Sequence, residues 1–358
     1  MIGKTKTIAI VIAAVIIASA GAGLVIFKHP AKDTLTPVYL IKVKQNNGTY
    51  ETVNLSTVGG YAYVPSLSGG QWTLDHPLSR IVSLIPSVTS TLYALHAYGD
   101  LVGVDQYSIY PVPTKNVTVF NIEVGSIPIE PIANLTPDAV ITTIGGFTQQ
   151  DINQVVNVLG IPYIVINPGN ISQIEAQNVI LGSLTGNSNN ASIINDWMNV
   201  NLENLQKDLQ NITAQKEYSV FYDLGAGSGG LYTAGPGTFI QSIFNRDHLV
   251  NIVNISGYPD VPLSYVYNAT PDYVLLDQYV SVANLNTSLP NLQAVKNGSY
   301  FTVANDTFFD EPNFRTIYTI FWLGAHFYPE NVNMSSIVDF NTFTGLGLKQ
   351  SPEAGVNG

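Results

Sequence analysis

The stretch RIVSLIPSVTSTLYALHAYGDLVGVDQYSIYP, residues 80–111, alternates two kinds of hydrophobic pattern. An apolar run at 80–85 is typical of a buried strand, and residues 87–98 repeat their apolar side chains at helical spacing. A second apolar run follows at 101–104. Strand, helix and strand in this order form the unit from which parallel sheets are built, so the stretch predicts an α/β fold.

The same alternation continues on both sides of a long helical segment. The pattern predicts further strands at 138–143, 161–167, 218–224, 273–277 and 300–304, and further helices at 148–159, 238–245 and 314–328. Between the two series, residues 190–215 repeat apolar side chains every three to four positions without glycine or proline. We therefore expect two α/β lobes with mainly parallel central sheets, joined by one long helix that limits their relative movement.

A short internal repeat supports two related lobes. NLTPDAVI at 134–141 recurs as NATPDYVL at 268–275, and in both copies a proline and an aspartate precede a buried strand. The expected organisation is a membrane segment at 1–30, a β-rich leading segment at 31–79, an N-terminal lobe at 80–185, the connecting helix at 186–216 and a C-terminal lobe at 217–358.

The composition excludes several classes of protein. Only 11% of the 358 residues are charged and the net charge is −11, so the basic surface of a nucleic-acid-binding protein is missing. There is no cysteine, which excludes disulfides, thiol chemistry and a lipid-anchored N-terminal cysteine. We expect a monomer without a nucleic-acid partner.

The beginning of the chain predicts export. Residues 8–27 contain no charged side chain, and they are flanked by Lys4 and Lys6 before and Lys28 after. Twenty helical residues span about 30 Å, the thickness of a hydrocarbon core, so we expect a single transmembrane anchor. A cleaved signal peptide remains an alternative, since Ala18-Ser19-Ala20 resembles a processing site. Either way, the rest of the chain lies outside the cytoplasm at the cell membrane.

Sequons for N-glycosylation are more frequent than chance predicts. The chain holds thirteen, whereas its 33 asparagines and its serine and threonine content would give about five by chance. They begin at Asn47, Asn54, Asn116, Asn134, Asn170, Asn190, Asn211, Asn254, Asn268, Asn286, Asn297, Asn305 and Asn333. Proline follows Thr136 and Thr270, which makes the sequons of Asn134 and Asn268 poorer candidates. The alternative is that an asparagine-rich and threonine-rich chain forms sequons by accident.

The glycines of DLGAGSGGLYTAGPG, residues 223–237, imitate two enzyme motifs without satisfying either. Gly225, Gly227 and Gly230 have the spacing of a dinucleotide-binding loop, which needs a helix to begin inside the motif. Pro236 prevents such a helix, and the next one is expected to start near Thr238 as its N-cap. A serine-hydrolase nucleophile elbow fails as well, because it needs the same immediate helix and has glycine where Ala226 stands.

No other enzyme site emerges from the sequence. The five histidines are scattered, and none has a partner at metal-ligand spacing. Carboxylates are sparse and show no pairing on one helix face. We therefore predict no catalytic residue, no metal site, no cofactor and no enzyme activity.

Two loops that lead from a strand into a helix do recur, each with a proline. One contains Pro86 and Ser87, and the other contains Pro236. Ligands of α/β folds bind beyond the carboxyl ends of the strands, so we expect a ligand cleft between the two lobes. The loops expected there are aromatic, and such side chains give a large ligand flat contact area. The candidates are Tyr107, Tyr110, Tyr232, Tyr258, Phe308 and Phe309.

With these segments in place, the chain resembles the rigid-helix solute-binding proteins of ABC importers, which carry cobalamin, ferric siderophores or haem. Residues 80–111 resemble the first strand, helix and second strand of that family, ending in its ligand-contacting tyrosine loop. Similar correspondence holds for IEPIANLTPDAVI at 129–141, for 232–253 with 257–276, and for FRTIYTIFWLGAHFYPE at 314–330.

The resemblance implies a function and positions for it. It implies capture of a metal chelate and delivery to an ABC permease, with Tyr107 and Tyr110 in the tyrosine loop, and Tyr232 and Tyr258 as aromatic contacts of the second lobe. Glu130 matches one of two glutamates that dock to the permease, whereas Ser264 stands at the second position, near the Asn268 sequon.

The small number of arginines indicates which ligand charge is favoured. The chain has three, and only Arg315 corresponds to a cleft position of siderophore binders. A neutral or weakly charged macrocycle is therefore favoured over a strongly anionic siderophore. A surface structural or adhesive glycoprotein that reuses this scaffold is the alternative function.

Overall fold

The computed structural model describes residues 35–67, 69–122, 126–145, 147–210, 217–303 and 306–353. The chain divides into two units. The N-terminal unit contains residues 35–197 and 340–350, and the C-terminal unit contains residues 198–339 and 351–353. Residues 340–350 thus belong to the first unit, whereas we had expected all of 217–358 in the second.

The N-terminal unit is built on a six-stranded sheet with the strand order β3-β9-β8-β5-β6-β7. All neighbours are parallel except β3, which runs antiparallel to β9. Its strands are β3 (Tyr61–Tyr63), β5 (Ile81–Ser83), β6 (Leu101–Asp105), β7 (Thr118–Phe120), β8 (Ala139–Thr142) and β9 (Tyr163–Val165). A second sheet, of order β2-β1-β4, comprises β1 (Leu40–Lys44), β2 (Tyr50–Asn54) and β4 (Gln71–Leu74).

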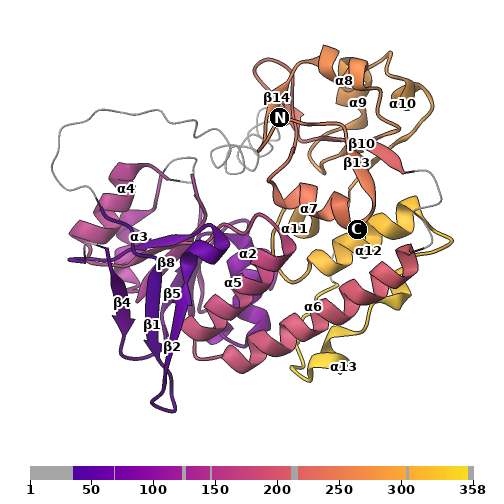
Figure 1. Cartoon of the computed structure of the whole chain (residues 1–358). Coiled ribbons are helices and arrows are strands. Elements are labelled where there is room, and N and C mark those ends of the chain that lie inside the picture. Colours follow the sequence, from indigo (N-terminus) through magenta and orange to yellow (C-terminus); the bar gives the residue numbers. More distant parts are fainter. Residues whose placement is uncertain are drawn as a thin grey trace. The chain divides into compact units, whose positions relative to one another are not determined.

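Helices cover both faces of the six-stranded sheet (Figure 1). The helices of this unit are η1 (Leu55–Val58), α2 (Pro86–Ala94), η2 (Tyr98–Asp100), α3 (Ile129–Asn134), α4 (Gln149–Asn153), the π-helix η3 (Gln154–Val158), α5 (Ile171–Leu184) and α13 (Phe340–Thr344). Helices α3 and α4 bury Ile132 and Ile152 against Val82 and Val140. Because side chains alternate along a strand, Ser83 faces the other side, where α2 and α5 contact each other.

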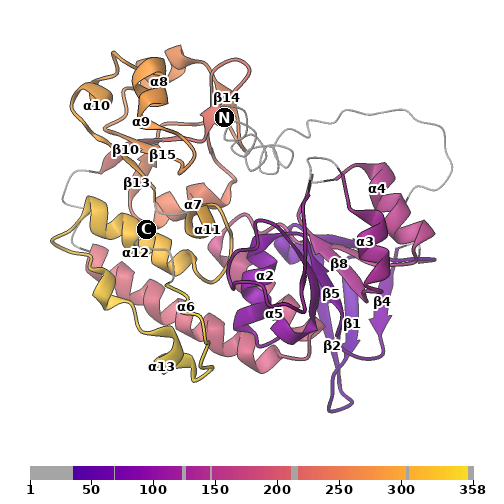
Figure 2. The same ribbon diagram turned by 180° about the vertical axis from the view of Figure 1, so that it is seen from behind.

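The C-terminal unit has a four-stranded parallel sheet of order β13-β10-β15-β16. Its strands β10, β13 and β15 are labelled in Figure 2. Its strands are β10 (Tyr218–Asp223), β13 (Leu249–Asn251), β15 (Tyr273–Leu276) and β16 (Tyr300–Thr302). A small antiparallel sheet contains β11 (Gly225–Ala226), β12 (Leu231–Tyr232) and β14 (Asp260–Val261).

The helices of this unit also lie on both faces of its sheet. They are α7 (Phe239–Arg246), α8 (Leu263–Ala269), α9 (Val282–Ser288), α10 (Gln293–Lys296), α11 (Asp306–Phe309), α12 (Thr316–Phe327) and η5 (Met334–Ser336). On one face, Phe221 and Val274 pack with Val266 of α8 and Leu285 of α9. On the other face, the rings of Tyr218 and Tyr273 contact Phe327 of α12.

A long helix, α6 (Ser188–Leu209), contributes residues to both units, with the boundary after Trp197. The prediction of a long helix here is confirmed, although the described helix ends at Leu209 rather than near residue 215. Residues 211–216 lie outside the described part of the chain.

The sequence repeat corresponds to one structural device in each unit. Asp138, just before β8, accepts hydrogen bonds at Oδ2 from the backbone N–H (2.8 Å) and hydroxyl (3.1 Å) of Ser79, just before β5. Asp272, before β15, likewise accepts hydrogen bonds at Oδ2 from the backbone N–H (2.9 Å) and hydroxyl (2.8 Å) of Ser219 in β10. Each aspartate therefore fastens the beginnings of two neighbouring parallel strands, which we name the strand clamp.

Candidate ligand-binding residues

The carboxyl ends of β5 and β6 lie at one edge of the N-terminal sheet, because these neighbours are parallel. Helix α2 begins directly after β5, with Pro86 at its first position, where a missing N–H breaks no helical bond. Pro86 is half-buried, whereas Ser87 is only 1% exposed. Of these two predicted ligand contacts, only Pro86 reaches the surface of this edge.

A turn fixed by Asp105 carries the predicted tyrosine loop. Asp105 Oδ1 accepts from the backbone N–H of Tyr107 at 2.7 Å, and Oδ2 accepts from the Ser108 hydroxyl at 2.8 Å. The hydroxyl of Ser108 is hydrogen-bonded to the hydroxyl of Thr89 in α2, with the oxygens 2.9 Å apart. The Thr89 hydroxyl in turn donates to the hydroxyl of Ser83 in β5 at 2.9 Å. Burial raises the pKa of Asp105 to about 6. The network holds the backbone of Tyr107 while its side chain stays partly exposed.

Tyr110 has a different role from Tyr107, although both were predicted ligand contacts. Its side chain is 6% exposed, and its ring packs edge-on against Tyr93. Its hydroxyl donates to the backbone oxygen of Gln350 at 3.1 Å. Gln350 also accepts from Val112 N–H through Oε1 at 2.8 Å and donates its own N–H to the Tyr93 hydroxyl at 2.8 Å. Tyr110 is thus part of the loop's support, and we name this set of bonds the Gln350 latch.

The glycine-rich stretch of the C-terminal unit forms a hairpin. After β10, the Asp223 carboxylate accepts from Gly225 N–H at 2.9 Å, and β11 then pairs with β12. A Cβ on Gly230 would lie 1.9 Å from the Val261 carbonyl oxygen, and one on Gly227 would lie 2.4 Å from the Asp260 carboxylate. Asp260 accepts from Gly229 N–H at 2.8 Å. The glycines therefore allow the hairpin to lie directly on β14.

The geometry of this stretch also differs from that of a dinucleotide-binding loop. Helix α7 begins at Phe239, nine residues after Gly230, with Thr238 as its N-cap accepting from Gln241 N–H at 3.2 Å. No helix begins inside the glycine motif, which a dinucleotide-binding loop requires, and the predicted N-cap Thr238 is confirmed.

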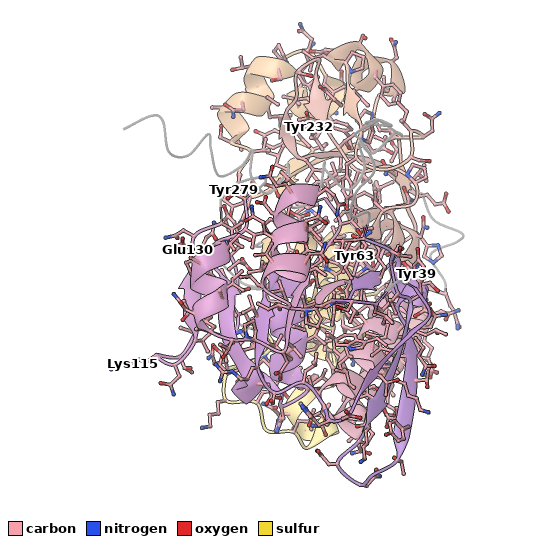
Figure 3. The ribbon with its side chains drawn as sticks, turned by 90° about the vertical axis from the view of Figure 1, so that its left-hand side faces the viewer. Tyr39, Tyr63, Lys115, Glu130, Tyr232 and Tyr279 are labelled. Atoms are coloured by element: carbon pink, nitrogen blue, oxygen red, sulfur yellow. The ribbon has the colours of Figure 1, made fainter. Side chains whose placement is uncertain are left out.

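A second tyrosine on an aspartate turn escaped the sequence analysis. Asp277, after β15, accepts at Oδ1 from Tyr279 N–H at 2.9 Å, as Asp105 does from Tyr107. The sequence Asp-Gln-Tyr occurs at both places, at 105–107 and 277–279, and this repeat was the signal that could have identified Tyr279. Tyr279 and the predicted Tyr232 of β12 are both partly exposed and belong to the same unit (Figure 3).

Carboxylates and phenols lie together at the carboxyl ends of β10 and β15. The Tyr222 hydroxyl is 3.2 Å from Asp277 Oδ2 and 3.0 Å from Asp310 Oδ1. Burial and these two carboxylates raise the pKa of Tyr222 far above its usual range. Burial, and then Asp310, also raise the pKa of the predicted contact Tyr258, whose side chain is partly exposed. This edge therefore contains one buried neutral phenol, Tyr222, and one partly exposed neutral phenol, Tyr258, beside acidic groups.

Phe309 and Arg315, both predicted as ligand contacts, are fully buried instead. Phe309 packs against Tyr222 with ring centroids 5.1 Å apart. The Arg315 guanidinium lies 3.9 Å from the centre of the Phe308 ring, and its Nε donates to the Pro352 carbonyl oxygen at 2.9 Å. We therefore assign both side chains, together with the buried Phe308, to the core of the C-terminal unit.

The predicted docking residue Glu130 is exposed in the first turn of α3 (Figure 3). Ser264, at the corresponding position of α8, is also exposed, and the first turn of that helix contains no acidic residue. Of the two predicted docking positions, only the one in the N-terminal unit therefore carries an acidic side chain.

Two further predictions concern a metal site and a membrane-spanning helix. In the ranges that the structure describes, no cluster of three or more acidic, histidine or cysteine residues could hold a metal ion. Nor does any described helix have the length and hydrophobicity to cross a bilayer. The predicted anchor at 8–27 lies outside the described residues, as do Asn211 and Asn305.

Comparison with known proteins places these observations in context. A family described as periplasmic binding protein matches residues 81–304. An uncharacterised ABC transporter substrate-binding lipoprotein of Bacillus subtilis is 25% identical over 208 residues, covering 57% of this chain and 65% of the relative. A cobalamin-binding protein of Halobacterium salinarum is 25% identical over 253 residues, covering 67% of this chain and 66% of the relative. The chain thus spans slightly under two thirds of the length of these curated relatives.

A solved structure agrees with the fold. The periplasmic haem-binding protein of Pseudomonas aeruginosa superposes with a TM-score of 0.62 at 20% identity, covering 71% of this chain and 94% of that one. At this identity the likeness concerns the fold alone.

Proposed function

The chain belongs to the periplasmic binding protein family, a family of solute-binding proteins rather than enzymes, and from this membership we propose that it captures a cobalamin-like, haem-like or iron-chelate ligand outside the cytoplasm. It then delivers the ligand to the permease of an ABC importer. The family match over residues 81–304 is the observation that carries the proposal. The relatives are solute-binding proteins, so they lend no support to the adhesive alternative.

Three partly exposed tyrosines are the proposed ligand contacts. Tyr107 and Tyr279 each follow an aspartate turn at the carboxyl end of a strand, and Tyr232 lies in the hairpin beside β14. Such rings offer rigid, flat area at low entropic cost, which suits a planar or corrin-like macrocycle. Tyr258 and Pro86 are kept as secondary contacts because both are partly exposed.

The acidic groups at the carboxyl ends of β10 and β15 favour a neutral ligand over an anionic one. Asp277 and Asp310 lie around the Tyr222 hydroxyl, and the Arg315 guanidinium is buried in the core. Carboxylates repel an anionic chelate, whereas neutral phenols can donate hydrogen bonds to a neutral one. We therefore expect a neutral cobalamin to bind more tightly than a strongly anionic ferric siderophore.

Titration of the purified chain tests the proposal. Cobalamin, haemin and ferric chelates would be added separately while tyrosine and tryptophan fluorescence is measured. Tyr107→Ala and Tyr279→Ala should each weaken binding of the accepted ligand roughly tenfold, or about 1.4 kcal/mol. Tyr50→Ala is the control, because Tyr50 is 46% exposed on β2, outside the family match.

Two results would contradict the proposal. One is a dissociation constant weaker than about 10 μM, or −7 kcal/mol, for every ligand tried. The other is equal loss of affinity in Tyr50→Ala, which would mean that the tyrosine effects are not local.

The proposal includes attachment to the outer face of the cell membrane through residues 8–27. An uncleaved anchor should keep the full-length chain in the membrane fraction after a high-salt wash, with its N-terminal peptide detectable by mass spectrometry. A chain that begins after residue 20 would instead identify the segment as a signal peptide.

A further inference from the structure

The sequons of this chain lie mostly on the surface. The structure describes the asparagines of eleven of the thirteen sequons, all except Asn211 and Asn305. Ten of the eleven are exposed, and the eleventh, Asn190, is half-buried. Eight exposed ones have no proline after the sequon: Asn47, Asn54, Asn116, Asn170, Asn254, Asn286, Asn297 and Asn333. Exposure of this set is what N-glycosylation requires.

The side-chain atoms of these asparagines are also arranged for the reaction. Asn47 Oδ1 accepts from the hydroxyl of Thr49 at 2.7 Å, and Asn54 Oδ1 accepts from the hydroxyl of Ser56 at 2.7 Å. Thr49 and Ser56 are the third residues of the two sequons. The asparagines at 170, 254, 297 and 333 likewise use Oδ1 as a hydrogen-bond acceptor. These contacts use the carbonyl oxygen and not Nδ2, the atom that becomes linked to sugar.

Asn190 shows the opposite arrangement. It lies in α6, and its Nδ2 donates to the backbone oxygen of Leu95 at 2.9 Å. Attack through this nitrogen would break that bond and would require the helix to open locally. Asn190 therefore serves as an internal comparison within the same folded chain.

The sequons of Asn134 and Asn268 form a second comparison. Asn134 is the last residue of α3, and Asn268 lies near the end of α8. Their threonines, Thr136 and Thr270, have positive φ angles of 44° and 48°, and proline follows each. A proline directly after the threonine makes a sequon a poorer substrate for glycosylation. The two sequons affected lie at α3 and α8, the helices that carry the predicted docking positions.

We propose that the protein is N-glycosylated at the eight exposed asparagines, while Asn190, Asn134 and Asn268 remain free of sugar. The donor is an oligosaccharide carried on a membrane lipid through phosphate. Asparagine Nδ2 forms a bond to C1 of the first sugar, the bond from C1 to the phosphate oxygen breaks, and the proton lost by the amide is taken up by the leaving phosphate. The lipid phosphate leaves with the bonding electrons. The proposal requires the extracytoplasmic location but no particular ligand.

Mass spectrometry of the full chain, purified from the membranes of its own organism, provides the test. Intact glycopeptides should be found at more than half of the eight exposed sites and at none of the three excluded ones. Thr49→Ala and Ser335→Ala should each reduce the mass of the intact protein by one glycan. Ser192→Ala, which removes the sequon of Asn190, should change the mass only by the substitution itself.

A sugar-free chain, sugar at fewer than half of the exposed sites, or modification of Asn190 overturns the proposal. Sugar at Asn134 or Asn268 overturns the part that concerns α3 and α8. Thermal unfolding of each variant separates loss of a glycan from loss of the fold. Ligand binding by the same preparations is measured independently, so failure of one proposal leaves the other standing.

Discussion

At the scale of single residues, the hairpin after β10 depends on a missing side chain. A Cβ on Gly230 would lie 1.9 Å from the Val261 carbonyl oxygen; that oxygen is backbone and the position of Cβ is fixed by the backbone, so neither atom can rotate away. Gly230→Ala should therefore lower the free energy of unfolding by about 1–3 kcal/mol, the usual cost of overpacking. Urea denaturation measures this change.

Gly229→Ala is the matched control for that variant. Its added Cβ would lie 3.7 Å from Asp260 Oδ2, an ordinary contact distance. The control should cost less than about 1 kcal/mol. Equal destabilisation by both variants would show that the loop's flexibility, and not the close approach to β14, explains the glycines.

The buried Asp105 predicts a pH dependence of stability. Burial raises its pKa to about 6, above the unfolded value near 3.9, so the folded state holds the proton more tightly. This contribution to stability is present below about pH 4 and is lost as the pH rises to 6, by roughly 2–3 kcal/mol. Asp105→Asn keeps an acceptor for Tyr107 N–H and does not ionise.

The measurement is a comparison of Asp105→Asn with the wild type at pH 4 and pH 7. The variant's stability relative to the wild type should increase between the two values. Asp223, whose pKa burial also raises to about 6, titrates identically in both proteins and cancels. A constant difference would mean that Asp105 is ionised at its ordinary pKa.

Burial limited what could be predicted for individual site residues. Tyr110, Phe309 and Arg315 have residue types suited to ligand contact, but tertiary packing covers all three. No local pattern reports that Gln350, distant in sequence, accepts the Tyr110 hydroxyl. Tyr279 was different, because the Asp-Gln-Tyr repeat at strand ends was visible in the sequence.

At the scale of elements, the strand clamp should stabilise each unit separately. Asp272→Ala leaves the N–H and hydroxyl of Ser219 without their acceptor, at a cost of about 1–3 kcal/mol. Asp138→Ala should cost less, because Ser79 is exposed and water can replace the carboxylate. Denaturant unfolding of both variants tests this order.

Asp196→Ala is the control for the strand clamp. Asp196 is exposed in the middle of α6, where alanine has higher helix propensity than aspartate. It should change stability by no more than about 0.5 kcal/mol. If Asp272→Ala behaves like the control, the clamp contributes nothing net and the repeat is only a sequence coincidence.

Elements with strong periodicity were predictable, and those defined by pairing were not. The expected helix at 314–328 corresponds to α12, and the strand at 218–224 corresponds to β10, each within two residues. The strand β3 escaped prediction because it is three residues long and depends on antiparallel pairing with β9, about 100 positions later. Local sequence contains no information about such a partner.

At the scale of the whole molecule, Glu130 is the proposed link to the permease. An exposed carboxylate that meets a permease arginine acts mainly on association rate and salt dependence. Glu130→Gln should therefore leave ligand affinity unchanged and slow ligand-stimulated ATP hydrolysis by the reconstituted importer. Glu203→Gln, an exposed acid in α6, should leave both unchanged.

The competing interpretation of Glu130 is purely structural. A carboxylate in the first turn of α3 interacts favourably with the helix dipole, by about 0.3–1 kcal/mol. That interpretation predicts a small loss of stability in Glu130→Gln with normal ATP hydrolysis. The two assays together therefore distinguish docking from helix stabilisation.

The Gln350 latch has a consequence for biosynthesis. Its acceptor for the Tyr110 hydroxyl is made 240 residues after the tyrosine itself. At about 5–20 residues per second, the ribosome needs roughly 12–50 s to cover that distance. Throughout this interval the tyrosine loop lacks its bond to Gln350, because residues 340–350 of the N-terminal unit have not yet been made. A nascent chain therefore acquires a finished loop only after Gln350 has been made, and residues 198–339 of the second unit are all made before it.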